Sequence, residues 1–165
     1  MTDVVKCAVC GEEHPRSQIE LFFRRPDEVA ALSPDERSAR VRESADLCML
    51  DGQRYFVRAL LPLPVQNRDR PYCIGIWAEA SFDAFHRIRE LWDDPDQASE
   101  PAFAVILAND VPGLESTRGL RALLRLSDPA TRPRVFVSEA VHQLHREQSN
   151  GITEHRVHEY SSYFS

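Results

Sequence analysis

The sequence has almost no lysine, few glycines and no long apolar run, and each shortage limits what the protein can be. Lys6 is the single lysine, so arginine supplies the other basic residues of a chain whose formal net charge is −6. No stretch concentrates enough basic residues to follow a phosphate backbone, and the overall charge repels nucleic acid. We therefore expect no nucleic-acid partner.

The apolar runs are short. The longest, such as 59–65 and 102–108, cannot cross a bilayer. The amino-terminal residues turn polar at once, unlike a secretory signal peptide. These features predict a cytoplasmic protein without membrane contact. In that compartment the four cysteines are expected to be thiols, thiolates or metal ligands more often than disulfides.

Familiar catalytic motifs are also missing. The sequence contains no glycine-rich phosphate loop, no nucleophile elbow and no His-Glu-x-x-His. Acidic residues are scattered along the chain, and a single sequence does not select which two of them form an acid–base pair. These absences favour a binding protein over an enzyme.

What is present is typical of a globular protein. Apolar residues make up 42% and charged residues 28% of 165 residues, which fits one domain with its own core. Eleven prolines against six glycines indicate many short elements closed by turns. We predict a single α+β domain over 1–165, with an antiparallel sheet core and a helix-covered face. A Cys/His knuckle at 1–20 precedes a sheet-rich core at 45–138 and closing helices at 139–165.

The clearest local signal is a β-hairpin. Residues 47–50 and 54–61 flank Asp51-Gly52, a dipeptide suited to the positive φ angles of a type I′ turn. Counted as a two-residue turn, it pairs Cys48 with Tyr55 and puts both on one face of the sheet. The other face of the second strand mixes arginine with apolar residues, which indicates that something covers part of the sheet there.

Further elements follow from caps and periodicity. Ser33 and Glu36 have the spacing of a capping box, and Ser81 can cap a second helix. Gly75 within a strand marks a close backbone approach or a bulge. Strands are expected at 71–78, 102–107, 120–126 and 134–137, and helices at 33–43, 81–92, 139–147 and 153–160.

The sharpest candidate site is the amino-terminal pattern Cys-x-x-Cys-Gly-x-x-His. Zinc prefers four thiolate or imidazole ligands, and Cys7 and Cys10 in a tight turn present two sulfurs on one side. His14 supplies an imidazole, and Cys48 on the first hairpin strand is available as the fourth ligand. The predicted metal site is therefore zinc bound by Cys7, Cys10, His14 and Cys48.

Two alternatives to zinc stay open. In the first, the leading segment is a reduced turn and Cys48 is a buried core thiol. In the second, Cys7 and Cys10 form a redox dithiol. This reading is weaker, because no helix-forming run follows to lower the pKa of the first thiol. The histidine pairs at 142 and 145 and at 155 and 158 favour solvated helix faces over a metal site, and His142 is a candidate helix cap.

Several segments together are typical of one family. They are CAVCGEEH at 7–14, LSPDER at 32–37, DLCMLDGQRYFVR at 46–58, LPLPV at 61–65, IGIWAEAS at 74–81 and RELWDDP at 89–95. Along essentially its whole length the chain resembles a bacterial family catalogued only as domain of unknown function 2199. It departs from that pattern at Ala104, where glycine is expected, and at Gln143, where proline is expected. The resemblance implies a shared fold and cysteine knuckle, but no activity.

Three functions are compatible with these observations. The first is a non-enzymatic binding or adaptor protein in which zinc has a structural role, since a filled coordination shell leaves no position for substrate. The second is a metal- or thiol-dependent enzyme with its site beside Cys7 and Cys10. The third is an immunity or regulatory protein whose acidic surface meets a basic protein partner. The sequence does not predict an oligomeric state.

Overall fold

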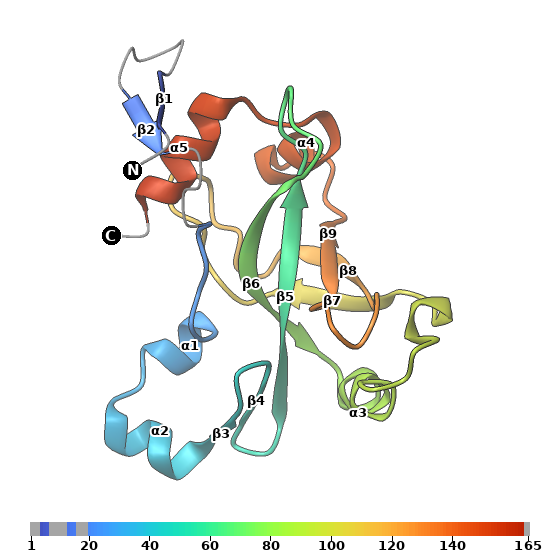
Figure 1. Cartoon of the computed structure of the whole chain (residues 1–165). Helices are drawn as coiled ribbons and strands as arrows, with labels where there is room; N and C mark the ends of the chain where they lie inside the picture. The colour runs from blue at the N-terminus through green and yellow to red at the C-terminus, as the bar shows by residue number, and fades with distance from the viewer. Residues whose placement is uncertain (1–3, 7–12, 16–19, 164–165) are drawn as a thin grey trace.

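The computed structural model describes residues 4–6, 13–15 and 20–163, which form an α+β protein as predicted (Figure 1). A hairpin of β1 (Val4–Lys6) and β2 (Glu13–Pro15) is separate from a seven-stranded sheet. The strands of that sheet are β3 (Val41–Glu43), β4 (Leu47–Leu50), β5 (Arg54–Leu63), β6 (Tyr72–Ala80), β7 (Phe103–Leu107), β8 (Arg121–Arg125) and β9 (Arg134–Val137). The helices are α1 (Asp27–Ala30), α2 (Pro34–Arg40), α3 (Phe82–Glu90), α4 (Gln143–Asn150), α5 (Glu154–Ser162) and the 3-10 turn η1 (Gln97–Ser99).

Strands β5 to β9 form a closed ring of pairings. Neighbouring strands from β3 to β9 pair antiparallel in chain order, and β5 also pairs in parallel with β9 through Leu60 and Arg134. The backbone N–H of Leu60 donates to the carbonyl of Pro133 at 2.8 Å. The five strands therefore curl around one interior, as a sheet does when it closes into a barrel. The sequence does not predict this closure, because it joins segments far apart in the chain.

The interior of the ring holds the main hydrophobic core. Along β5 alternate residues point inward, among them Val57, Ala59 and Leu61, and all three are fully buried. Helices α3, α4 and α5 add side chains to the same core, including Phe85 and Tyr160. Burial of this apolar surface is the main stabilising term of the fold.

A smaller core lies on the outer face of β4, β5 and β6. It consists of Val29, Cys48, Leu50, Phe56, Trp77 and Ala108. The segment that carries α1 covers it: Val29 is fully buried there, and the Trp77 indole Nε1–H donates to the carbonyl of Phe23 at 3.0 Å. The predicted cover over the mixed face of β5 is therefore confirmed.

The β4–β5 hairpin corrects the predicted strand register. Both central residues of the turn at 51–52 have positive φ, +55° and +63°, as predicted. Gln53, however, is an additional loop residue, so Cys48 pairs with Phe56 and not with Tyr55. A shift of one residue moves a side chain to the opposite face of a sheet. Cys48 therefore lies in the smaller core and not with the inward-facing residues of β5.

The segment before α1 runs along β6. Phe22 bridges Gly75 in parallel, the Phe23 N–H donates to the Gly75 carbonyl at 2.8 Å, and the Gly75 N–H donates to the Leu21 carbonyl at 2.9 Å. A Cβ atom on Gly75 would lie only 2.8 Å from the Cβ of Phe22. The predicted close backbone approach at Gly75 is confirmed.

The predicted helix caps are present, while two helix ends differ from the prediction. Ser33 and Glu36 form the capping box, and the Ser81 hydroxyl accepts from the N–H of Ala84 at 3.1 Å. Helix α2 ends at Arg40 instead of residue 43, because the chain continues into β3 and pairs with β4. The His142 Nδ1 accepts from the N–H of Leu144 at 3.0 Å, so α4 begins later than predicted.

Strand β5 is longer than predicted. It continues through Pro62 to Leu63, although proline was expected to end the strand. Pro62 stays in the strand opposite Cys73, and its carbonyl accepts from the side-chain amide of Gln148 at 3.2 Å.

None of the described helices combines the length and the apolar character that crossing a bilayer requires.

Candidate functional site

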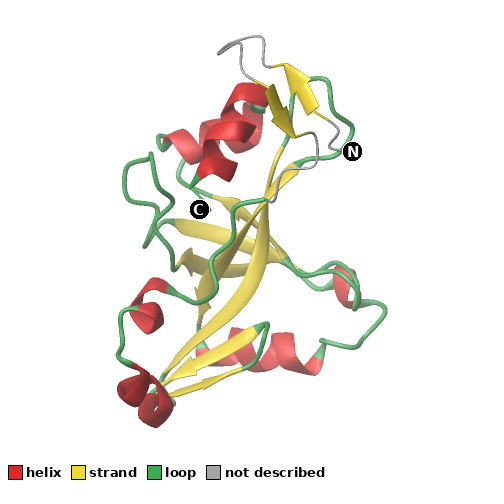
Figure 2. Ribbon diagram, turned by 60° about the vertical axis from the view of Figure 1, so that its left-hand side comes forward, coloured by secondary structure: helices red, strands yellow, loops and turns green. Residues whose placement is uncertain are grey.

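Of the four residues predicted to bind metal, only His14 and Cys48 belong to strands that the structure describes. Cys7 and Cys10 lie outside the described residues. His14 belongs to β2, where it pairs with Val5 of β1. Figures 1 and 2 show β1 and β2 at one end of the molecule and β4, which carries Cys48, at the other. Zinc binding by these residues therefore stays a prediction.

Cys48 lies in an apolar environment. Its side chain is buried against Phe56 and Trp77, and burial raises the pKa of its thiol to about 12. The Glu43 carboxylate reinforces this direction and Arg25 opposes it. Because zinc binds the thiolate form, this environment favours the alternative of a core cysteine. Among the described residues, no three His, Cys, Asp or Glu side chains gather so as to hold a metal ion.

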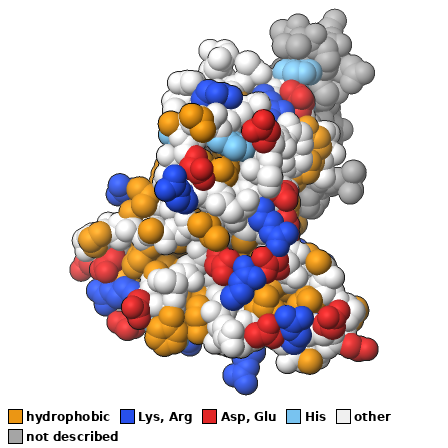
Figure 3. Space-filling view, turned by 180° about the vertical axis from the view of Figure 1, so that it is seen from behind, with side chains coloured by type: hydrophobic (Ala, Val, Ile, Leu, Met, Phe, Trp, Pro, Cys, Tyr) orange, Lys and Arg blue, Asp and Glu red, His pale blue; other side chains and the backbone are white. Residues whose placement is uncertain are grey.

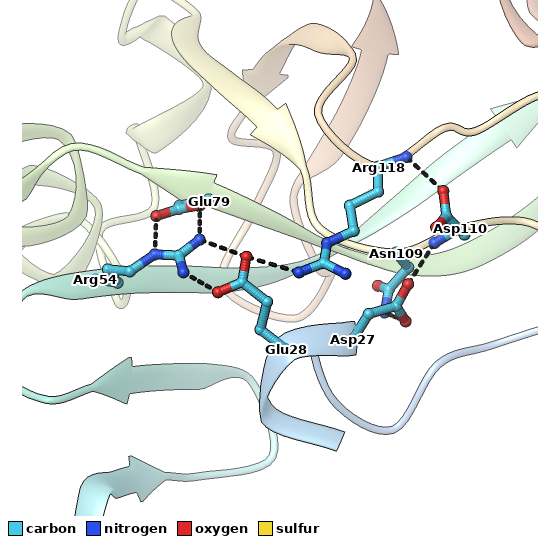
Figure 4. Close-up of polar contacts among 7 residues, drawn as sticks. All are labelled: Asp27, Glu28, Arg54, Glu79, Asn109, Asp110 and Arg118. Atoms are coloured by element: carbon cyan, nitrogen blue, oxygen red, sulfur yellow. Dashed lines mark hydrogen bonds and ion pairs between the residues drawn. The ribbon is translucent and has the colours of Figure 1, made fainter. Parts of the chain in front are cut away.

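A cluster of charged and polar side chains lies where α1 meets the sheet (Figure 4). Arg54 on β5 donates to both carboxylate oxygens of Glu28 and of Glu79, with Nη2 2.7 Å from Glu79 Oε1. Arg118, in the loop before β8, places its Nη2 2.7 Å from Glu28 Oε1. Glu28 therefore bridges two arginines that come from distant parts of the chain.

A second part of the cluster centres on Asn109, which is fully buried. Its Oδ1 accepts from the N–H of Trp77 at 2.9 Å. Its Nδ2 donates to the carbonyl of Arg25 and to Asp27 Oδ1, each at 2.9 Å. The other oxygen of Asp27 accepts from the N–H of Asp110 at 2.7 Å. Asn109 thus joins β6 to the segment before α1.

The cluster borders a pocket of about 410 Å³, lined by Pro26, Glu28, Arg54, Phe56, Glu79, Ile106, Leu107, Ala108, Asp110, Ser116, Arg118 and Gly119. Asp110 is engaged as well, because the hydroxyl of Ser116 donates to it at 2.6 Å and, with the N–H of Arg118, lowers its pKa. Each charged group in Figure 4 has a partner of opposite charge or a hydrogen-bond donor. The arrangement ties α1 and the 108–119 loop to the sheet, which favours a structural role.

The outer face of β7, β8 and β9, called the open face below, differs from this cluster. Its side chains are those of Ala104, Ile106, Arg121, Leu123, Arg125, Arg134, Phe136 and Ser138. Ile106 and Leu123 are 38% and 40% exposed, although their inward-facing neighbours are buried. An open depression of about 520 Å³ lies over β7 and β8, and Glu79 of β6 also lines it. Large apolar side chains exposed together on one face are typical of an interaction surface.

Three arginines accompany these apolar residues on the open face. Arg121, Arg125 and Arg134 are exposed, and none of them forms an ion pair within the part of the chain that the structure describes. The Glu139 carboxylate accepts from the backbone N–H of Arg121 at 2.8 Å. Figure 3 shows acidic and basic side chains interspersed over the back of the molecule.

Sequence reasoning did not find the open face. The spacing of Arg121, Leu123 and Arg125 places them on one face of a predicted strand. What the pattern lacks is the register with the next strand, which sets Phe136 opposite Leu123 and Arg134 opposite Arg125. The shared face of Arg121, Leu123 and Arg125 could therefore be predicted from the sequence of β8. The pairing of β8 with β9, which adds Arg134 and Phe136 to that face, could not, because it joins separate segments of the chain.

The fold and these sites define an α+β protein built on a small closed sheet, with an amino-terminal hairpin and one open, arginine-bearing sheet face. The chain belongs to the bacterial family described as "Uncharacterized protein conserved in bacteria (DUF2199)", whose model matches residues 6–152. The resemblance stated from the sequence is thereby confirmed. No curated protein and no solved structure matches the chain.

Proposed function

We propose that this protein is a non-enzymatic binding or adaptor protein that holds a protein partner on the open face. The observation that carries the proposal is the combination of exposed Ile106 and Leu123 with arginines that lack ion pairs among the described residues. Arginine is enriched in protein interfaces, and a contiguous exposed apolar patch rimmed by polar residues marks an interaction site. A partner seated there removes apolar surface from water and supplies carboxylates to Arg121, Arg125 and Arg134.

Site-specific photocrosslinking of the full chain in the cells that produce it tests this function. A photoreactive phenylalanine analogue replaces Ala104, which is exposed on β7, and in a matched control it replaces Ser38, which is exposed on α2. We expect a discrete adduct from position 104 and none from position 38. Leu123→Asp should remove the adduct, because a charge would then occupy the apolar centre of the face.

Two results would contradict the binding function. One is a set of adducts that is the same at position 104 and at position 38, since that pattern reports random collision. The other is an adduct from position 104 that survives Leu123→Asp. Circular dichroism of the Leu123→Asp chain checks that its fold is retained. Loss of the adduct with an intact fold is the result that supports the proposal.

A structural zinc site in the knuckle is the second part of the proposed function. Two thiolates and one imidazole, from Cys7, Cys10 and His14, are a ligand set that zinc accepts. The antiparallel pairing of β1 with β2 on either side of residues 7–12 suits a knuckle, in which a hairpin presents the ligands. Bound zinc would stabilise a short hairpin that is marginal by itself.

Metal analysis of chains purified under reducing conditions tests the zinc site. We expect about one zinc per chain in the unmodified protein and none after Cys7→Ser with Cys10→Ser. Cys48→Ser is the matched comparison: retained zinc makes Cys48 a core thiol, and lost zinc makes it the fourth ligand. If the unmodified chain contains no zinc under these conditions, the proposed zinc site is wrong. The proposed binding of a partner on the open face does not depend on this result.

A further inference from the structure

Resting on the proposed function, we infer that the partner binds through an acidic segment that also carries apolar side chains, and that one of its carboxylates lies between Arg125 and Arg134. The apolar side chains of the segment pack on Ile106 and Leu123. This assigns the chemistry of the partner and a position for its charge.

The first observation is the direct opposition of the two arginines. Arg125 of β8 and Arg134 of β9 are register partners, so their side chains leave the sheet side by side on the same face. In antiparallel pairs the Cα atoms of such partners are about 4.5–5.5 Å apart, and like charges there are unfavourable. A carboxylate between them would accept hydrogen bonds from both guanidinium groups and neutralise the repulsion.

The second observation is how arginine is placed elsewhere in this acidic chain. Arg25, Arg40, Arg54, Arg68, Arg87, Arg118, Arg132 and Arg156 all lie within ion-pair distance of a carboxylate. Others, such as Arg42 and Arg70, are exposed singly, and the register partner of Arg42 is Met49. The Arg125–Arg134 pair therefore combines exposure, like charge at a register position and adjacent apolar surface.

An acidic protein segment fits this face better than nucleic acid does. Leu123, at the centre of the face, and Ile106 beside it offer aliphatic surface and not the stacked aromatic platform that single strands use. Phe136 is half-buried beside Leu123. Three arginines are also few for a protein of net charge −6 that must attract a polyanion. Carboxylates next to aliphatic side chains satisfy both parts of the surface at once.

The inference is tested by fluorescence anisotropy with labelled synthetic peptides. The first peptide alternates Asp and Glu with Leu and Phe, the second replaces each acid by its amide, and the third replaces each apolar residue by Ser. We expect the full-length protein to bind the first peptide most tightly. Added salt should weaken this binding, since part of the attraction is between exposed charges.

Paired variants locate the charge contact. Arg125→Gln with Arg134→Gln should weaken binding of the acidic–apolar peptide about tenfold or more, because hydrogen bonds to charged groups contribute strongly. Arg42→Gln with Arg70→Gln removes the same charge from exposed positions elsewhere and should change binding less than about twofold. If the two double variants lose the same peptide affinity, the loss is caused by the change in net charge and not by the position of Arg125 and Arg134. That result would overturn the inference.

The outcomes separate this inference from the proposed function. If the amide peptide binds as tightly as the acidic one and Leu123→Asp abolishes both, the open face binds apolar segments and the acidic partner is wrong. If no peptide binds and photocrosslinking from position 104 also fails, the proposed function falls as well. Tighter binding of a single-stranded oligonucleotide through Arg125 and Arg134, or self-association in sedimentation that requires them, would overturn the partner class.

Discussion

Two groups of arginines in this protein are used in opposite ways. Around α1, Arg54 and Arg118 share Glu28, and Arg54 also holds Glu79. On the open face, Arg125 and Arg134 lie opposite each other without a carboxylate among the described residues. The first group holds a segment of the chain in place, whereas the second leaves its hydrogen-bonding capacity available. The two groups therefore differ in their ion pairing and not in residue type.

The largest expected effect is on the structural side of the comparison. Asn109→Ala removes three hydrogen bonds and leaves the buried N–H of Trp77 without its acceptor. We expect a loss of about 2–4 kcal/mol in the free energy of unfolding, measured by urea denaturation. Asn150→Ala, at an exposed position at the end of α4, should change it by less than about 0.5 kcal/mol. Similar values for the two variants would contradict a structural role for the cluster.

A smaller effect is expected from Glu28→Gln. This change leaves Arg54 with Glu79 and removes the only carboxylate that contacts Arg118 among the described ion pairs. Because these groups are about one third exposed, screening limits the loss of unfolding free energy to about 1 kcal/mol. The loss should shrink in high salt. A stabilised variant would mean that the Glu28 charge is strained, as in a site that awaits another ligand.

The pH dependence of the 108–119 loop tests the same region. The Ser116 hydroxyl, followed by the N–H of Arg118, lowers the pKa of Asp110 below its ordinary value of 3.8. A lowered folded-state pKa contributes stability that is complete above the ordinary value and is lost as the pH falls through the lowered one. An NMR titration should therefore give a low Asp110 pKa that rises in Ser116→Ala and stays unchanged in Ser138→Ala. An ordinary Asp110 pKa in the unmodified protein would be inconsistent with this network.

The smallest effect on stability is expected on the open face. Arg125→Gln with Arg134→Gln removes two like charges at a register position, so the free energy of unfolding should change by less than about 0.5 kcal/mol or rise slightly. Thermal unfolding of the double variant beside Arg42→Gln with Arg70→Gln measures this. A clear loss of stability only in the Arg125 and Arg134 variant would show that these side chains have structural partners. The open-face arginines would then not differ from those around α1.

Local features of the fold could be predicted from the sequence. The Ser33–Glu36 capping box, the Ser81 cap and the close approach at Gly75 follow from chemistry within a few residues. The hairpin turn at 51–52 was also predicted, but one additional loop residue reversed the face on which Cys48 lies. Strand register is sensitive to a single residue in a way that helix capping is not.

The parts that could not be predicted depend on contacts between distant segments. The pairing of β5 with β9 closes the ring, and the pairing of β8 with β9 sets Arg125 against Arg134. Asn109 and Asp27 meet only because α1 folds back on the sheet. For the candidate metal site, the cysteine and histidine ligands are predicted from the sequence alone, and zinc binding stays a prediction.

The most direct test of the account is to map the acidic–apolar peptide onto the full chain by NMR amide shifts. The account predicts the largest shifts at 103–107, 121–125 and 134–137, where the open face lies. The amides of Asp27, Glu28 and 108–119 should move little, because the charges there already have partners. The largest shifts around α1 and the 108–119 loop, with the open face unchanged, would contradict the assignment of binding to the open face.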